Sequence, residues 1–286
     1  MAVNLSKFLG PMVCAESPPG PCPTCAVRVV KSSWIDIVRR TWVCPGLLLL
    51  LLMTVSRAQV TTSITSDGTL GTGVIPNGNV HEIIGGTRPG NGSNLFHSFR
   101  RFNLGTGDTA HFIGEPGIEH IIGRVTGGEA SMIDGTLQSD ASLFLLNPQG
   151  IMFGPSATLY VNGSFHASTA DVLRFADGAA FSTRLSAQSV LTVASPSAFG
   201  FLQASSAGIF IQSSALTVPE GKTLSMIGGD ITIMGDGDAK PDTPNLLAPG
   251  GRINLVSIAS SGDVEFDPTS QLSELDVGAF DRRGSS

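Results

Sequence analysis

The stretch that decides the fold is LFLLNPQGIMFGPSATLYVNGSFHAS, which runs from Leu143 to Ser168. Short apolar runs are broken every few residues by Asn, Pro or Gly, and Thr158–Val161 alternates polar and apolar positions. This period of two is typical of short β-strands that bury one face. The stretch carries few side chains that could do chemistry, which raises the question of what such a surface is for.

The same pattern continues along the chain, as at Ile209–Gln212 and Asp230–Met234. The 286 residues include 35 Gly and only 14% charged residues, a composition that favours a β protein over a helical bundle. From residue 59 onward no amphipathic helix is predicted. Tight reversals are predicted at Asp67-Gly68, Asn77-Gly78, Asn91-Gly92, Asp134-Gly135, Asn162-Gly163 and Asp177-Gly178.

Two all-β architectures fit this pattern. Asn-Gly and Asp-Gly pairs favour an antiparallel sandwich, whereas the later segments read as stacked rungs of a parallel β-helix. The expected rungs are Ala215–Val218, Thr223–Ile227, Ile231–Met234, Arg252–Val256 and Asp263–Phe266. The Pro-rich segment 240–251 is expected to be a loop between rungs, so one mature domain is predicted.

The N-terminal region reads as a signal peptide. Arg39 and Arg40 precede the apolar run Gly46–Val55, and Ser56-Arg57-Ala58 provides small residues for cleavage before Gln59. The run is too short for a membrane-spanning helix, which needs about 20 apolar residues. Residues 1–58 are therefore predicted to be an extended signal peptide or to include an early start codon, and the mature chain is not expected to be an integral membrane protein.

Cysteine and charge exclude several functions. All four cysteines precede residue 59, and no metal or cofactor is predicted at the Cys22–Cys25 pair because a structural zinc site needs four ligands. Removal of residues 1–58 takes six of 17 Lys and Arg residues and two of 23 Asp and Glu residues, which leaves a formal charge of −10. Such a chain is not expected to bind nucleic acid.

Enzyme signatures are incomplete. His81-Glu82 begins like a zinc-protease motif, but Gly85 stands where the second His is required. Asp230, Asp236 and Asp238 could act as paired carboxylates, which keeps a secreted β-helix polysaccharide lyase or hydrolase, or a carbohydrate-binding protein, as the alternative function. No enzyme activity is predicted.

Several motifs in one order resemble the N-terminal two-partner secretion domain of filamentous-haemagglutinin-like exoproteins, also called the haemagglutination activity domain. The motifs are NLFHSFRRFNL (94–104), IIGRVTGG (121–128), IDGTL (133–137), LFLLNPQGIMFGPSATLYVNGSFHASTADVLRFADG (143–178), VPEGKTLSMIGGDITI (218–233) and APGGRINLVSIAS (248–260). The resemblance implies a right-handed parallel β-helix of the pectin-lyase-like kind with an N-terminal β cap. It covers residues 59–286, which either stand alone or are truncated before a longer adhesin or toxin region.

The resemblance also implies a function. The domain would be a secretion-targeting and fold-nucleating unit of a Gram-negative exoprotein, recognised by an outer-membrane β-barrel transporter with periplasmic polypeptide-transport-associated domains. The exoprotein would reach the cell surface or medium and serve adhesion, with a host receptor, cell-surface receptor or polysaccharide as a further partner. No cofactor is implied.

Two sets of residues are candidates for these roles. Asn147, Pro148, Gly150 and Ile151 match the family motif Asn-Pro-Asn-Gly-Ile, with Gln149 in place of the second Asn, and they either nucleate the fold or contact the transporter. A first Asn-Pro motif is degenerate around Glu115–Ile118. Phe96, Phe99 and Phe102 repeat at a spacing of three and form either part of the cap or an apolar docking stripe.

Overall fold

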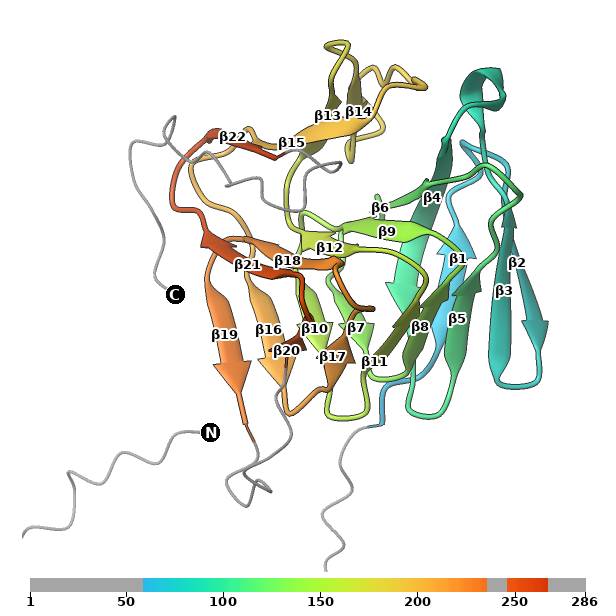
Figure 1. The fold of residues 1–286 in the computed structure, drawn as a ribbon, viewed down its shortest axis with the longest axis vertical. Helices are drawn as coiled ribbons and strands as arrows, with labels where there is room; N and C mark the ends of the chain where they lie inside the picture. Colours follow the sequence, from blue (N-terminus) through green and yellow to red (C-terminus); the bar gives the residue numbers. More distant parts are fainter. Residues whose placement is uncertain (1–58, 236–245, 267–286) are drawn as a thin grey trace, which may run out of the picture. The chain divides into compact units, whose positions relative to one another are not determined.

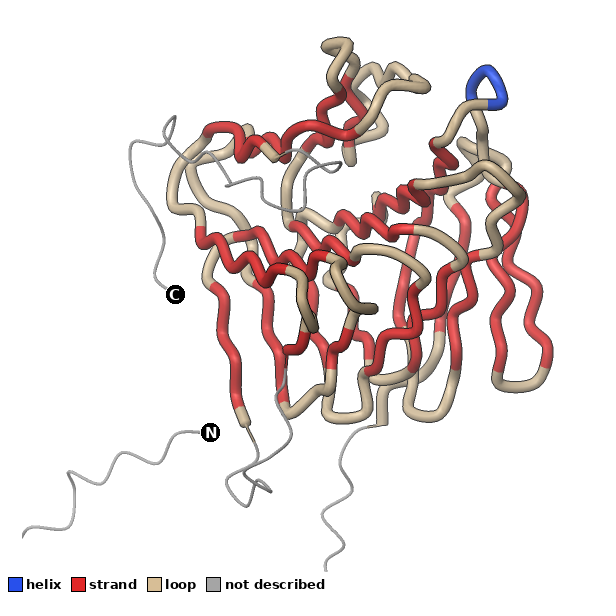
Figure 2. Tube along the Cα trace, in the orientation of Figure 1, coloured by secondary structure: helices blue, strands red, loops and turns tan. Residues whose placement is uncertain are grey.

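The structure is a computed structural model that describes residues 59–235 and 246–266. The described residues form strands joined by turns, with one short 3-10 helix, η3 (Pro89–Asn91), among them (Figure 2). The predicted signal peptide, the four cysteines, Asp236 and Asp238 lie outside the described residues.

Three sheets wind around a common core (Figure 1). Sheet A contains β1 (Ser63–Ser66), β4 (Asn94–Asn103), β6 (His120–Val125), β9 (Ser142–Leu146), β12 (Phe165–Ser168), β18 (Thr223–Gly228) and β21 (Arg252–Ser257). Sheet B contains β2 (Thr72–Asn77), β3 (Val80–Gly85), β5 (Thr109–Phe112), β8 (Thr136–Ser139) and β11 (Thr158–Val161), and it is extended by β17 (Leu216–Thr217) and β20 (Leu246–Leu247). Sheet C contains β7 (Ser131–Ile133), β10 (Ile151–Phe153), β16 (Ile209–Gln212) and β19 (Ile231–Met234).

The chain passes through sheets A, C and B in that order, as in β9, β10 and β11, and it repeats the circuit for about six turns. Strands of successive turns pair in parallel, as β9 pairs with β12 and β12 pairs with β18. This arrangement confirms the parallel β-helix and rules out the antiparallel sandwich that composition favoured.

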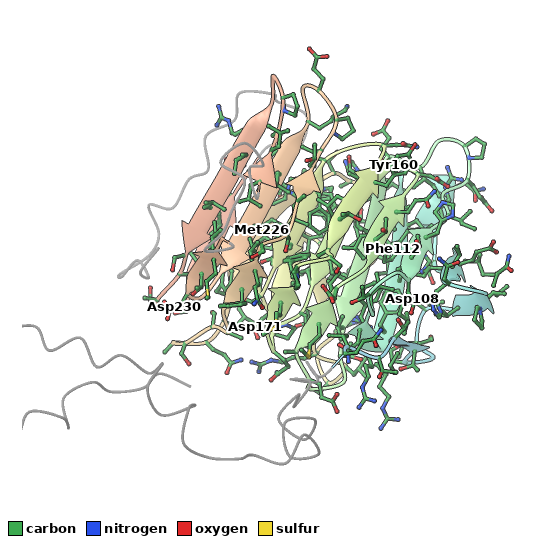
Figure 3. The ribbon with its side chains drawn as sticks, turned by 90° about the horizontal axis from the view of Figure 1, so that it is seen from below. Asp108, Phe112, Tyr160, Asp171, Met226 and Asp230 are labelled. Atoms are coloured by element: carbon green, nitrogen blue, oxygen red, sulfur yellow. The ribbon has the colours of Figure 1, made fainter. Side chains whose placement is uncertain are left out.

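The interior of the solenoid is filled by one aligned set of side chains from each turn. In sheet A the pairing register aligns Leu95, Ile121, Leu143, Phe165, Leu224 and Ile253. We call the buried apolar cluster inside the solenoid the inner core. It includes Phe112 and Met226, which are labelled in Figure 3 and are both 0% exposed. Each large apolar side chain buried in this way contributes about 1.5–3 kcal/mol, so the solenoid interior is the main source of stability.

Glycine has two separate uses at the predicted reversals. Gly78 and Gly178 have positive φ values of 61° and 83° and close the β2–β3 and β13–β14 hairpins. Gly163 lies instead at a corner of the solenoid, where a Cβ atom would come within 2.4 Å of Ser142 Oγ. At that corner glycine is required because backbones of successive turns approach closely.

Antiparallel strands cap the N-terminal end of the solenoid. Strand β1 pairs with β4, and the β2–β3 hairpin adds to β5, so sheets A and B begin with strands that reverse the chain direction. Pro76 in the outermost strand β2 lacks a backbone N–H and discourages further pairing at that edge. The expected N-terminal β cap is thereby confirmed.

An additional layer covers the outer face of sheet A, and the sequence did not predict it. Sheet D is antiparallel and consists of β13 (Val172–Phe175), β14 (Ala180–Ser182), β15 (Pro196–Phe201) and β22 (Gly262–Glu265), which lie above sheet A in Figure 1. The prediction of a solenoid rung at Asp263–Phe266 is wrong, because β22 pairs antiparallel with β15. Apolar side chains between sheets A and D, among them Phe144, Phe199 and Val264, form what we call the outer core.

Arg124 connects this layer to the cap. Its guanidinium is 4% exposed, donates from Nε to Ser98 Oγ at 2.7 Å and from Nη1 to the carbonyl oxygen of Ser182, and lies 4.6 Å from the centre of the Phe181 ring. Ser98 in turn donates to Asp67 Oδ2 at 2.5 Å. A buried charge with these partners links the cap, the first two turns and sheet D.

The C-terminal end of the described solenoid differs from the capped end. The last strand is β21 in sheet A and β19 in sheet C, and β20 ends the extension of sheet B. Ile253, which continues the inner-core column, is 41% exposed, and Leu255 beside it is 42% exposed. Among the described residues, this end therefore has parallel terminal strands and partly exposed apolar side chains in place of an antiparallel cap.

Candidate functional site

The Asn-Pro motif forms the corner at which the chain leaves sheet A for sheet C. Asn147 follows β9 directly, and Ile151 begins β10. Pro at position 148 disfavours helical geometry at Asn147, which suits a corner between two strands. We call residues 147–151 the Asn147 corner.

Asn147 is fully buried, and its side chain is saturated with hydrogen bonds. Nδ2 donates to the carbonyl oxygen of Glu129 and to Ser131 Oγ, both at 2.9 Å, and Oδ1 accepts from the Gln149 N–H at 3.0 Å. The Asn147 N–H also donates to the carbonyl oxygen of Ser168 in the following turn. Asn147 therefore joins three successive turns and has no surface of its own in the folded domain.

The other residues of the corner divide between the core and the surface. Ile151 is 2% exposed and aligns with Ser131 and Ile209 in sheet C. Gly150 has φ of 111°, a conformation that favours glycine, and its N–H donates to the Asn147 carbonyl oxygen. Pro148 is half-buried and Gln149 is exposed, so these two residues are what the folded corner presents to solvent.

A small hollow lies beside the exposed part of the corner. Its volume is about 220 Å³, and its lining includes Thr126, Pro148, Gln149, Asp171, Arg184 and Gln203. Arg184 Nη2 donates to Asp171 Oδ1 at 3.1 Å, so the ion pair neutralises the one buried carboxylate of the hollow. Residues that follow β6 and β9 and residues that flank the strands of sheet D thus line one polar hollow.

The three phenylalanines lie on two faces of β4. Phe99 and Phe102 point into the inner core, with ring centres 5.1 Å apart, whereas Phe96 lies in the outer core 5.0 Å from Phe181. All three are at most 1% exposed. In the folded domain they pack the first turn and present no common surface stripe.

Three buried histidines were not singled out from the sequence. Burial lowers the pKa of His97 to about 4 and that of His166 to about 3, with neighbouring His120 adding to the second shift. Burial also lowers the pKa of His120, against the opposing effect of Glu119. For two of them the signal was present in the sequence, because His97 and His166 stand among apolar residues within β4 and β12, whereas His120 begins β6 after Glu119.

His97 also carries an unsatisfied atom. Its Nδ1 lies 3.3 Å from Thr72 Oγ1, but Nε2 has no hydrogen-bond partner among the described residues. An unpaired buried polar atom costs about 1–3 kcal/mol. His97 is therefore a weak point of the inner core near the cap.

Of the candidate catalytic groups, Asp230, His81 and Glu82 lie among the described residues, and Asp236 and Asp238 do not. Asp230 lies exposed between β18 and β19, and His81 Nε2 lies 4.0 Å from Asp108 Oδ2 in sheet B. A second hollow of about 580 Å³ beside Met132 and Met152 has one carboxylate, Asp134, in its lining. Within residues 59–235 and 246–266 there is no cluster of three His, Cys, Asp or Glu residues that could hold a metal ion.

The chain is a capped parallel β-solenoid with an Asn-Pro corner. Residues 62–278 match the TPS secretion domain, the domain of two-partner secretion, and the chain belongs to this family. Domains of this family are parts of exported proteins that use a partner outer-membrane transporter.

A solved structure has a similar fold. The chain is similar to the HMW1 secretion domain from Haemophilus influenzae, with a TM-score of 0.52 and 19% sequence identity over 78% of this chain. The match spans 49% of the HMW1 chain, and at this identity it shows the fold alone. A comparison with curated proteins found no match. The described residues contain no helix long and apolar enough to cross a membrane.

Proposed function

We propose that this chain is the secretion-targeting and fold-nucleating domain of an exported protein. In this proposal residues 1–58 are the signal peptide, and residues 59–286 are recognised by an outer-membrane β-barrel transporter with periplasmic polypeptide-transport-associated domains. The exported protein reaches the cell surface or the medium and serves adhesion. Membership of the TPS secretion domain family supports the export role.

The observation that carries the proposal is the difference between the two ends of the solenoid. The N-terminal end is closed by antiparallel strands, whereas within residues 59–235 and 246–266 the opposite end of sheet A is the parallel strand β21, in which Ile253 is 41% exposed. A chain that emerges N-terminus first can form the cap, and each later turn can then pair with the one before it. Burial of apolar surface in each added turn opposes return into the pore without nucleotide hydrolysis.

For the Asn147 corner we favour fold nucleation over direct contact of Asn147 with the transporter. Its side chain is buried and bonded to Glu129 and Ser131 of the preceding turn, which supports a role in stacking turns. Gln149 is exposed, so any contact that the folded corner makes would use Gln149 and Pro148. In the extended chain before folding all of these side chains are accessible.

The proposal is tested by expressing the full chain with and without its cognate transporter and collecting periplasm and medium separately. We expect the native chain in the medium only when the transporter is present. Appearance in the medium without the transporter would overturn the proposal.

Two variants separate the roles at the corner. Asn147→Ala should reduce both folding in vitro and export, whereas Gln149→Ala should fold normally. If Gln149→Ala folds normally but is not exported, the corner contacts the transporter directly. If both variants are exported like the native chain, the corner has neither role.

A further inference from the structure

Two buried histidines lie in the layer between sheet A and sheet D. His166 in β12 stacks on Phe144 of β9, with ring centres 4.4 Å apart, and it also faces Phe199 of β15 at 6.5 Å and Phe266 after β22 at 5.8 Å. His120 in β6 packs against the other side of this group, 5.8 Å from Phe144. Sheet D therefore rests partly on an aromatic stack that contains a titratable ring.

The polar contacts of both rings come from neutral groups. His166 Nδ1 lies 3.0 Å from Ser225 Oγ of β18, which also accepts from Asn254 of β21. His120 Nδ1 lies 3.0 Å from Asn94 Oδ1 of β4. Asn94 Nδ2 donates in turn to the carbonyl oxygens of Thr192 and Ala194 in the sheet D segment.

The charged groups around the layer do not favour a protonated His166. Arg124 of β6 is buried in the same layer, and Arg174 of β13 is paired with Asp263 of β22 at 2.9 Å. Glu119 favours protonation of His120 only. Within the described residues no carboxylate lies in ion-pair contact with His120 or His166. A proton on His166 would face apolar rings and a second imidazole.

We propose that sheet D is an acid-sensitive cover, which separates from sheet A when His166 and His120 become protonated while the solenoid beneath it stays folded. The separation would expose the outer face of sheet A, with Phe96, Ile122 and Phe144. An exported protein would in this way present a new apolar surface in an acidic environment.

The burial of the two imidazole rings determines how the opening of sheet D depends on pH. Burial holds the pKa of His166 at about 3 in the closed state, against an ordinary value of 6.5 when the ring is in water. Closure is therefore favoured above pH 6.5 and is progressively weakened between pH 6.5 and pH 3. At pH 5 the opening equilibrium for this one histidine rises about 30-fold relative to neutral pH, and His120 acts in the same direction.

The solenoid is expected to stay folded at an acidic pH at which sheet D has separated from sheet A. Opening of sheet D breaks the outer core, whereas the parallel ladders of sheets A, B and C and the inner core remain intact. Local opening of one layer costs less free energy than global unfolding. His97 lies inside the inner core, so its protonation requires opening of the solenoid and is a separate event.

Amide hydrogen exchange of the full secreted chain between pH 7.5 and pH 4.5, corrected for the intrinsic pH dependence of exchange, tests the proposal. At pH 5 we expect exchange in residues 172–201 and 262–265 to rise at least about 30-fold, while β8 and β11 stay protected. His166→Phe keeps an aromatic ring in the stack, and Ser225 Oγ keeps Asn254 as a partner. This variant should lose most of the rise, and His166→Phe combined with His120→Gln should lose all of it.

The control is His111→Gln in sheet B, 3.2 Å from Asp140 and away from the outer core, which should keep the full rise. His120→Gln alone should lose part of the rise, so the test remains decisive if His166→Phe does not fold. The proposal is overturned if these variants respond to acid like the native chain, or if β8 and β11 exchange in step with sheet D.

Discussion

Substitution of Asn147 by Ala tests whether the corner is a structural element. The change removes two donated bonds at 2.9 Å and one accepted bond at 3.0 Å. Glu129 and Gln149 are exposed, so water can replace Asn147 at the Glu129 carbonyl and the Gln149 N–H. Ser131 is 0% exposed and would lose its partner inside the protein. With about 1 kcal/mol for the bond to Ser131, which water does not replace, and about 1–3 kcal/mol for the buried Ser131 hydroxyl left unpaired, we expect a loss of about 2–4 kcal/mol.

The loss would be measured by urea unfolding followed by far-UV circular dichroism, with Gln149→Ala as the matched control. Gln149 keeps its backbone N–H in the variant, and its side chain is exposed, so the control should change stability by less than about 0.5 kcal/mol. A stability for Asn147→Ala within about 1 kcal/mol of the native chain would refute the reasoning, because it would mean that the three bonds are dispensable.

Three further predictions, with four substitutions, test other parts of the fold. Phe99→Ala should lower the free energy of unfolding by about 3–5 kcal/mol, whereas Tyr160→Ala, at a 69% exposed position, should change it by less than about 0.5 kcal/mol; equal effects in urea unfolding would contradict the burial argument. The pKa of His97 is about 4 in the folded chain, so its stabilising effect is complete above pH 6.5 and lost as pH falls toward 4. His97→Leu should therefore lose about 2 kcal/mol less stability than the native chain between pH 7 and pH 5, and an unchanged loss would show that His97 does not titrate on unfolding. Arg124→Met should lower stability by about 1.5–3 kcal/mol, because it removes the hydrogen bonds of a charged group to Ser98 and Ser182, and a melting temperature equal to that of the native chain would count against the link.

Much of the solenoid was predictable because its strands follow local patterns. Thr223–Ile227, Ile231–Met234 and Arg252–Val256 were expected as rungs, and they lie in β18, β19 and β21. Periodicity alone did not choose between sandwich and solenoid, since alternation shows which face is buried but not which strand is the neighbour. The family resemblance supplied that choice.

The outer layer could not be predicted because it depends on distant partners. Asp263–Phe266 has the alternation of a rung, yet its partner is β15, and nothing local distinguishes an antiparallel partner from a parallel one. The corner shows the same limit. Turn chemistry at Asn147 indicated a corner, but the partners Glu129 and Ser131 belong to the preceding turn.

The pairing of β15 with β22 has a consequence for the order in which the chain can fold as it emerges. Arg174 and Asp263 are 89 positions apart, so in the proposed export the ion pair between β13 and β22 forms only after nearly all of the described chain has left the transporter. Contacts of such long sequence separation form late, because the loop between them must first be ordered. In the proposed export, the first turns would remain with the outer face of sheet A incompletely covered until β22 pairs with β15, so the strand that completes sheet D is also among the last described segments to emerge.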